Sequence, residues 1–178
     1  MPASLGSAAP PQLHSVIGVS PALDLGPSAD ALHRPYNRVY ELKFLRALLS
    51  RYRRKVALFP HVYDPNLATG IGSLRELDDR ITAFYSGFTG AEDYYYRAAA
   101  ARVIDKIVVP TLILHALDDP FVRITDESCS RLDANLNIQL ITTHHGGHCA
   151  FLAQPDADTG YDGYWAEHTL LRFLLANA

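Results

Sequence analysis

Three short runs of apolar residues divide the chain and predict its strands. They are His14–Ser20, Thr111–His115 and Ile138–Ile141. Each run is nearly continuous in apolar side chains rather than alternating, which is typical of strands buried on both faces. Such strands belong to parallel sheets covered by helices, so the pattern predicts a small sheet between layers of helix.

Elsewhere the apolar positions recur at the spacing of a helix. Val39, Leu42, Leu45, Leu49 and Tyr52 predict a long helix from about Tyr36 to Val56. Pro, Gly and Asn residues indicate a loop between Phe59 and Ile71. Capping residues and apolar periodicity predict further helices that start at Ser28 and Ser73, run from Thr89 to about Ile104, and cover Asp126–Leu132 and Tyr161–Ala176.

This order of elements predicts an α/β protein with a parallel sheet of about three strands and right-handed crossovers. The first crossover, at about residues 28–106, is much longer than a helix that only covers the sheet. Insertions of this kind are typical of lids that lie over strand ends. We therefore expect a helical lid insertion in this region.

Composition is that of one ordinary globular domain: 178 residues, 48% hydrophobic and 20% charged. The net charge of −3 gives no reason to expect a nucleic-acid partner, and no apolar run is long enough to cross a bilayer. Residues 1–12 are rich in Pro, Ala and Ser and lack the features of a signal peptide. They predict a disordered tail before a domain at 13–178. With Cys129 and Cys149 expected to be reduced, we expect a cytoplasmic protein without stable membrane insertion.

The predicted long helix ends in a group of cations, Arg51, Arg53, Arg54 and Lys55. Positive charge suits a helix C-terminus because it faces the negative end of the helix dipole. A solvated helix end is therefore one interpretation. Contact with acidic head groups or with a partner is the other.

Acidic residues and histidines follow the second and third predicted strands. The carboxyl ends of parallel strands meet at one edge, where α/β enzymes hold their chemistry. A carboxylate beside a histidine fixes the imidazole tautomer and stabilises the imidazolium. We favour Asp119 over Asp118 because it directly precedes the turn at Pro120. His148 is the candidate base because Gly146 and Gly147 let the chain bend before it.

Other interpretations of these residues remain open. The two glycines can simply form a turn that leaves His148 at the surface. A metal site would combine His144, His145 and His148 with an aspartate. His115 lies within a strand and is expected to be a core histidine or one that supports the pair. Aromatic residues that form the core or line an acyl pocket are Phe84, Tyr85, Phe88, Tyr94, Tyr95, Tyr96 and Tyr161.

Several blocks resemble a known family. Leu112–Phe121 and His144–Phe151 resemble the acid and histidine blocks of α/β-hydrolases, closest to the YheT-like, embryogenesis-associated branch of predicted esterases. The likeness runs from about Gln12 to the C-terminus. It includes a segment after the first strand, Val19–Leu25, and lid segments at Pro35–Tyr40, Arg51–Lys55 and Asp93–Ala98.

This resemblance implies the C-terminal half of an α/β-hydrolase fold, with Asp119 as the acid and His148 as the base of a Ser-His-Asp triad. The reaction it implies is hydrolysis of carboxylic esters, small or lipid-like, through an acyl-enzyme on a serine. It implies no cofactor and no metal.

The nucleophile is the departure from the family. A G-x-S-x-G elbow is absent, and Pro2–Ser7 matches it only as Ser-Leu-Gly around Ser4. Since Pro10 and Pro11 leave no room for the helix that follows an elbow, we expect Ser4 to belong to the tail. We expect the chain alone to be inactive and marginally stable, with an open strand at 16–20 available for pairing. The alternative is a non-catalytic remnant, or a split-gene subunit that pairs with a chain carrying the nucleophile.

Overall fold

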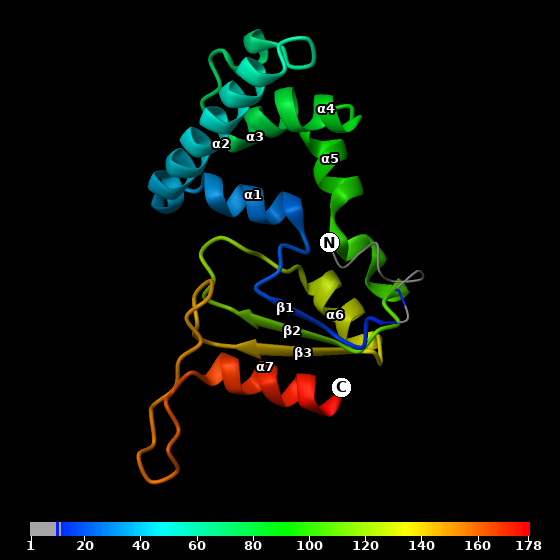
Figure 1. Ribbon diagram of the computed structural model, residues 1–178, viewed down its shortest axis with the longest axis vertical. Coiled ribbons are helices and arrows are strands. Elements are labelled where there is room, and N and C mark those ends of the chain that lie inside the picture. Colours follow the sequence, from blue (N-terminus) through cyan, green and yellow to red (C-terminus); the bar gives the residue numbers. More distant parts are fainter. Residues whose placement is uncertain (1–9, 11) are drawn as a thin grey trace. The chain divides into compact units, whose positions relative to one another are not determined.

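The computed structural model describes residue 10 and residues 12–178, and the chain forms two compact units (Figure 1). The sheet unit comprises the chain up to Asp24 together with Ala100–Ala178, and the helical unit comprises Leu25–Ala99. Residues 25–99 are thus inserted between the first and second strands, in the region where the sequence predicts an insertion at about 28–106. The predicted tail falls almost entirely outside the described residues.

Three parallel strands form the centre of the sheet unit. They are β1 (Val16–Val19), β2 (Thr111–Ala116) and β3 (Ile138–Thr143), in the order β1-β2-β3. All residues of the central strand β2 are buried, which explains why its sequence is a continuous apolar run. The predicted α/β class, with a parallel sheet of about three strands, is confirmed.

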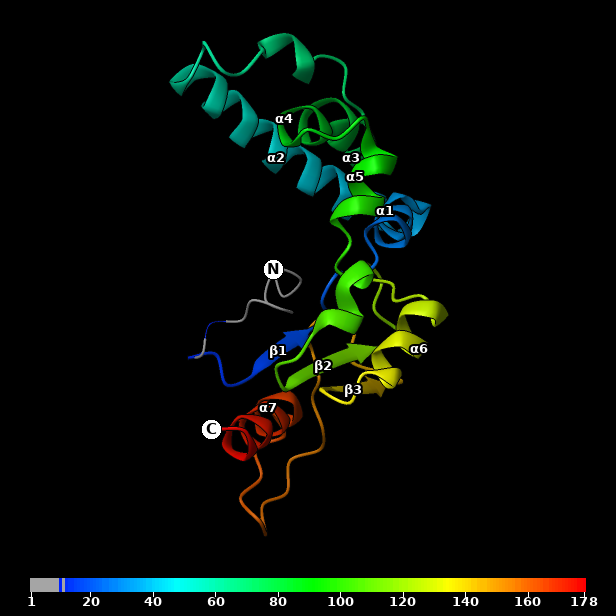
Figure 2. The same ribbon diagram turned by 90° about the vertical axis from the view of Figure 1, so that its right-hand side faces the viewer.

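Helices cover both faces of this sheet (Figure 2). On one face, Leu132 of α6 (Asp126–Ala134) packs with Ile113 of β2 and Ile104 of η5, the 3₁₀ segment Ala100–Lys106. On the other face, Trp165 of α7 (Trp165–Ala176) packs near Leu114 of β2. Successive side chains of β2 therefore pack on opposite faces of the sheet, as the pleat of a strand requires.

The helical unit has a core of its own. Leu45, Leu49 and Tyr52 from one face of its longest helix pack with Leu77 and Ile81. This helix, predicted at about 36–56, is observed at Arg38–Leu58 and is confirmed. The elements in order are α1 (Leu25–His33), η2 (Pro35–Asn37), α2 (Arg38–Leu58), η3 (Pro65–Ala68), α3 (Leu74–Leu77), the π-helix η4 (Asp78–Ala83), α4 (Phe84–Ser86) and α5 (Ala91–Ala98).

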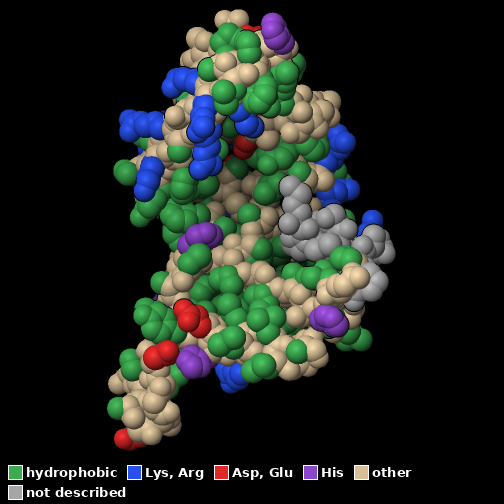
Figure 3. All heavy atoms as spheres, viewed as in Figure 1, with side chains coloured by type: hydrophobic (Ala, Val, Ile, Leu, Met, Phe, Trp, Pro, Cys, Tyr) green, Lys and Arg blue, Asp and Glu red, His purple; other side chains and the backbone are tan. Residues whose placement is uncertain are grey.

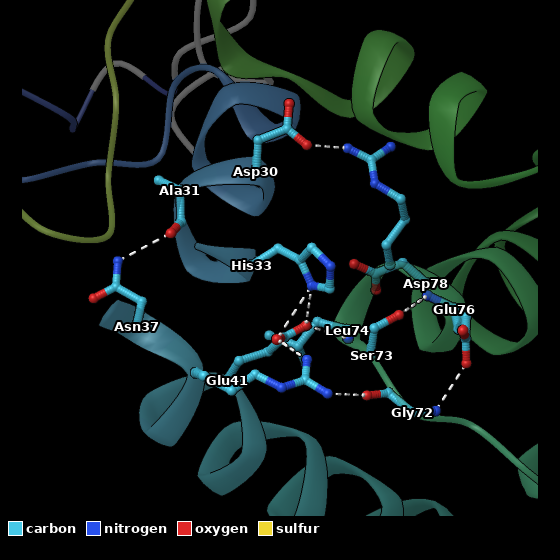
Figure 4. A network of polar contacts seen from close by, with 12 residues as sticks. Asp30, Ala31, His33, Asn37, Glu41, Gly72, Ser73, Leu74, Glu76 and Asp78 are labelled. Atoms are coloured by element: carbon cyan, nitrogen blue, oxygen red, sulfur yellow. Dashed lines mark hydrogen bonds and ion pairs between the residues drawn. The ribbon is translucent and has the colours of Figure 1, made fainter. Parts of the chain in front are cut away.

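A polar network joins the first helices of this unit (Figure 4). The buried carboxylate of Glu41 receives hydrogen bonds from His33 Nδ1 at 3.0 Å, from Arg38 at 2.5 Å and from the Leu74 amide at 3.2 Å. Burial acts to raise the pKa of Glu41, but these hydrogen bonds together hold its pKa below the ordinary value. Beside it, the hydroxyl of Ser73 accepts a hydrogen bond from the Glu76 amide, so the predicted cap at Ser73 is confirmed.

The other two predicted caps are wrong. The helix predicted to start at Ser28 starts at Leu25 and buries Ser28 within it, because Pro27 is tolerated in a first helical turn and does not block an earlier start. Thr89 does not cap α5, whose N-cap residue is Gly90. Asp79 of η4 accepts the hydrogen bond of the Ala91 amide instead, so a side chain distant in sequence replaces the local cap.

Two predicted helix lengths are also wrong. The helix predicted to reach Ile104 ends at Ala98, and Ala99 is extended. No local stop signal marks this end. The chain leaves the helical unit here, and the Ala101 amide bonds to the Leu23 carbonyl at 3.1 Å. The last helix begins at Trp165 rather than Tyr161, since Tyr161 pairs with Asp156 in an antiparallel bridge.

Candidate active site

Asp119 lies in the turn that follows β2. Its side chain is fully buried, and one carboxylate oxygen, Oδ1, accepts hydrogen bonds from the amides of Phe121 at 2.8 Å and Val122 at 3.0 Å. The Asp119 amide bonds back to the Ala116 carbonyl at 3.1 Å. The backbone therefore satisfies one oxygen and leaves Oδ2 for another partner.

That partner is His148. Its Nδ1 lies 2.9 Å from Asp119 Oδ2, and the ring makes an edge contact with Phe121, with 5.7 Å between ring centroids. Because a carboxylate only accepts, the hydrogen of a neutral imidazole in this pair belongs on Nδ1. Nε2 is then the nitrogen with a lone pair for an incoming proton. The side chain is 43% exposed, so it is reachable from solvent.

The glycines before His148 shape the loop that carries it. Gly147 has a left-handed backbone, with φ of 53°. Gly146 packs so closely that a Cβ there would lie 2.6 Å from a ring carbon of the buried Phe151. Position 147 therefore requires glycine for its backbone angle, and position 146 requires it for space and for its own positive φ of 155°. The turn predicted from the pair exists, and it brings the imidazole to Asp119 rather than leaving it without a carboxylate partner.

Asp118 binds the loop that carries His148. Its Oδ1 accepts the Gly147 amide at 2.8 Å, and its Oδ2 lies 3.3 Å from His145 Nδ1. The hydrogen bond from the Gly147 amide is the main cause that lowers the pKa of Asp118; burial opposes it, and His145 adds to the lowering. Asp118 is thus ionised and holds the histidine loop, while Asp119 contacts His148.

The three histidines of the loop do not converge. His145 is strongly exposed and faces Asp118, and His144 is exposed. Within residues 10 and 12–178, no group of three or more His, Cys, Asp or Glu side chains is arranged to hold a metal ion. The geometry therefore does not support the metal site that was the alternative interpretation.

His115 is buried on β2 close to the pair. Burial lowers the pKa of its imidazole, and the charge of Asp119 opposes that effect. Its Nδ1 is buried without a hydrogen-bond partner in the described part of the chain, so of the two interpretations of His115 the structure does not favour a satisfied core histidine.

Two further residues at this edge, Ser20 and Phe121, are not predicted as site residues from the sequence. Ser20, directly after β1, is buried with φ of 44°, and its hydroxyl has no partner among the described residues. Phe121 contacts the imidazole of His148. A serine between a strand and a proline is the only sequence signal for the first, and the contact of the second depends on the loop fold.

Ser4 lies outside the described residues. A groove of about 640 Å³ in the sheet unit is lined by Pro110, Thr111, Asn137 and Ile138 and by the end of α7. It therefore lies at the amino ends of β2 and β3, opposite the edge that holds Asp119. Of the aromatic candidates, Tyr95 is buried and bonded to Asp78, whereas Phe84 is exposed.

Comparison with known proteins gives relatives by sequence. No protein-family model and no solved structure matches the chain. "Putative esterase YheT" of Escherichia coli strain K12 is 37% identical over 68% of this chain and 36% of its own length. "Medium-chain fatty acid ethyl ester synthase/esterase 2" of Saccharomyces cerevisiae is 36% identical over 60% of this chain and 22% of its own. "Putative esterase slr0264" of Synechocystis sp. is 27% identical over 97% of this chain and 48% of its own length.

The parallel sheet and these relatives together define the class. The chain belongs to the α/β-hydrolase superfamily, and its relatives are named as esterases and lipases. Within that superfamily its relatives include YheT and the embryogenesis-associated protein EMB8 of Picea glauca, the branch that the sequence blocks resemble. The chain spans between about a fifth and a half of the length of the curated relatives compared above.

Proposed function

We propose that this chain supplies the acid and the base for hydrolysis of carboxylic esters by a Ser-His-Asp mechanism. The observation that carries the proposal is the 2.9 Å contact between His148 Nδ1 and a fully buried Asp119 whose other oxygen is fixed by two amides. A carboxylate fixed in this way holds the imidazole in one tautomer and orientation.

In the proposed reaction, His148 Nε2 takes the proton of a serine hydroxyl as the serine oxygen attacks the ester carbonyl carbon. The imidazolium that forms is stabilised by the charge of Asp119, and its proton passes to the alcohol as the carbon–oxygen bond to the alcohol breaks. A water molecule then hydrolyses the acyl-enzyme by the same steps, and the serine is regenerated. The serine comes from a part of the enzyme outside residues 1–178.

We propose a small or lipid-like ester as the substrate, since the relatives are named for esters and lipids. The helical unit is the proposed lid. It leaves the sheet unit after the carboxyl end of β1, which is the edge that holds Asp119 and His148. Across the described residues no helix is long and apolar enough to cross a membrane.

The test uses a fluorophosphonate probe, which reacts only with an activated serine. The chain alone is compared with a chimaera in which the part of Escherichia coli YheT that precedes the matched region is joined to Leu13. We expect labelling of the chimaera only, and loss of labelling with His148→Ala. Labelling of the chain alone that is lost with Ser4→Ala would instead place the nucleophile in residues 1–12.

A second candidate function is that of a subunit that pairs with another chain. Within the described residues β1 pairs with β2 alone, so its other edge presents unpaired backbone groups. A strand from a chain with the nucleophile would pair there. Mixing the two parts as separate chains and measuring sedimentation tests this, and the candidate fails if the parts never associate.

A further inference from the structure

One segment of the helical unit contains no acidic residue. From Leu42 to Tyr63 the chain has no Asp or Glu, although the whole protein carries a net charge of −3. Helix α2 holds seven of the 16 Lys and Arg residues and one of the 19 Asp and Glu residues. That one acid is Glu41, which is buried and already bonded to Arg38 and His33. The positive charge of α2 is therefore not balanced within the helix.

The other six cations of α2 form what we call the cationic face. All are exposed, and none forms a salt bridge in the part of the chain that the structure describes; they are Lys43, Arg46, Arg51, Arg53, Arg54 and Lys55. The space-filling view shows Lys and Arg side chains gathered over α2, with hydrophobic side chains among them (Figure 3). Cations gathered in this way without salt bridges attract anions, and the attraction weakens with salt.

An apolar end adjoins the cationic face. Leu58, Phe59 and Val62 are 60%, 55% and 60% exposed. Leu58 follows Arg54 by one helical turn, and the Val62 amide bonds to the Phe59 carbonyl at 3.0 Å in the turn that ends α2. The core of the helical unit uses the opposite face of α2. These three apolar side chains are thus exposed together beside the cations, where the fold of the unit does not need them.

We propose that the cationic face and its apolar end dock on an anionic lipid surface. The cations would lie at the phosphate level of the head groups, and Leu58, Phe59 and Val62 would enter the interface below them. A helix with cations on its exposed side and large apolar residues next to them binds in this way without crossing the bilayer. An acidic protein would satisfy the charge but not the apolar end, so lipid is the favoured partner.

Vesicle flotation of the whole chain tests this proposal. We expect binding to vesicles of phosphatidylcholine mixed with phosphatidylserine, weakening as salt is added, and little binding to phosphatidylcholine alone. The double variant Arg51→Glu and Arg54→Glu should bind on the order of tenfold more weakly or worse, since each cation near an anionic surface contributes severalfold in affinity. Leu58→Ser should weaken binding in the same direction.

Matched controls lie in the sheet unit. Lys106→Glu with Arg172→Glu makes the same change in net charge on exposed residues, and Leu171→Ser removes a leucine that is 56% exposed, close to the 60% of Leu58. Both should bind as the parent chain does. Equal loss in the controls, or equal binding to neutral vesicles, would overturn the proposal. No binding to either vesicle would also overturn it and would leave an acidic protein as the occupant. Because flotation measures no turnover, its outcome is independent of the proposed hydrolysis.

Discussion

At the scale of single residues, the proposed site depends on the contact between His148 and the buried carboxylate of Asp119. Asp119 and His148 follow from motif and position, and the structure brings them into contact. The amides that fix Asp119 and the orphan Nδ1 of His115 have no local pattern, because they depend on how a turn and a strand fold together. Asp118 differs from its neighbour in the direction of its side chain and in its exposure, which the sequence does not indicate.

Gly146 provides a residue-scale prediction. We expect Gly146→Ala to destabilise the sheet unit by about 1–3 kcal/mol, because the new methyl group would overlap Phe151. Urea unfolding followed by the fluorescence of Trp165, the only Trp, measures this directly, since that ring lies beside Phe151.

Gly147→Ala is the matched control for this prediction. Gly147 has a left-handed φ of 53°, but a Cβ added there would meet open space. The substitution should therefore cost about 1 kcal/mol from backbone strain alone. If the Gly147 variant is the less stable of the two, close packing at Gly146 is not the dominant effect.

At the scale of elements, periodicity predicts the long helix and the three strands, but local caps predict helix ends poorly. The Ser73 cap forms because its partner, the Glu76 amide, is three residues away. The Thr89 cap does not form because Asp79, twelve residues before Ala91, reaches that amide first. The end of α5 is set by the change of unit near Ala99, for which the alanine run offers no signal.

Ser73 gives the prediction for elements. Ser73→Ala should destabilise the helical unit by about 1 kcal/mol, since it removes the side-chain acceptor at the start of α3. Thermal unfolding by far-ultraviolet circular dichroism measures the change. The control is Ser50→Ala on the exposed side of α2, which should be neutral or slightly stabilising. An equal loss at both serines would mean that the cap contributes nothing.

At the scale of the whole molecule, the chain carries two cores joined by insertion of one unit into the other. The layers of the sheet unit follow from the alternation of strands and helices along the chain. From the sequence, the helical unit at residues 25–99 is visible only as a crossover that is too long. Its exact ends are not predicted, since no composition change marks Leu25 or Ala99. The open edge of β1 is a further feature at this scale. The resemblance to α/β-hydrolases predicts it at 16–20, and among the described residues β1 pairs with β2 alone.

Acidification should weaken the helical unit through Glu41. Its pKa is lowered in the folded state, so its stabilisation is complete above its ordinary pKa of 4.5 and is lost as the pH falls through the folded value. We expect thermal unfolding to shift to lower temperature below about pH 4.5, with a smaller shift in Glu41→Gln. Identical pH profiles for the two proteins would contradict the role given to this carboxylate.

The central claim is that Asp119, and not Asp118, works with His148 in ester hydrolysis. The most direct measurement is kcat of the chimaera on a p-nitrophenyl ester with each aspartate replaced by asparagine. We predict a loss of about 10⁴-fold for Asp119→Asn, because the imidazole loses its fixed tautomer. Asp118→Asn should cost no more than about 100-fold, since it acts only on the position of the loop. A larger loss at Asp118, or an active Asp119→Asn enzyme, would contradict the account.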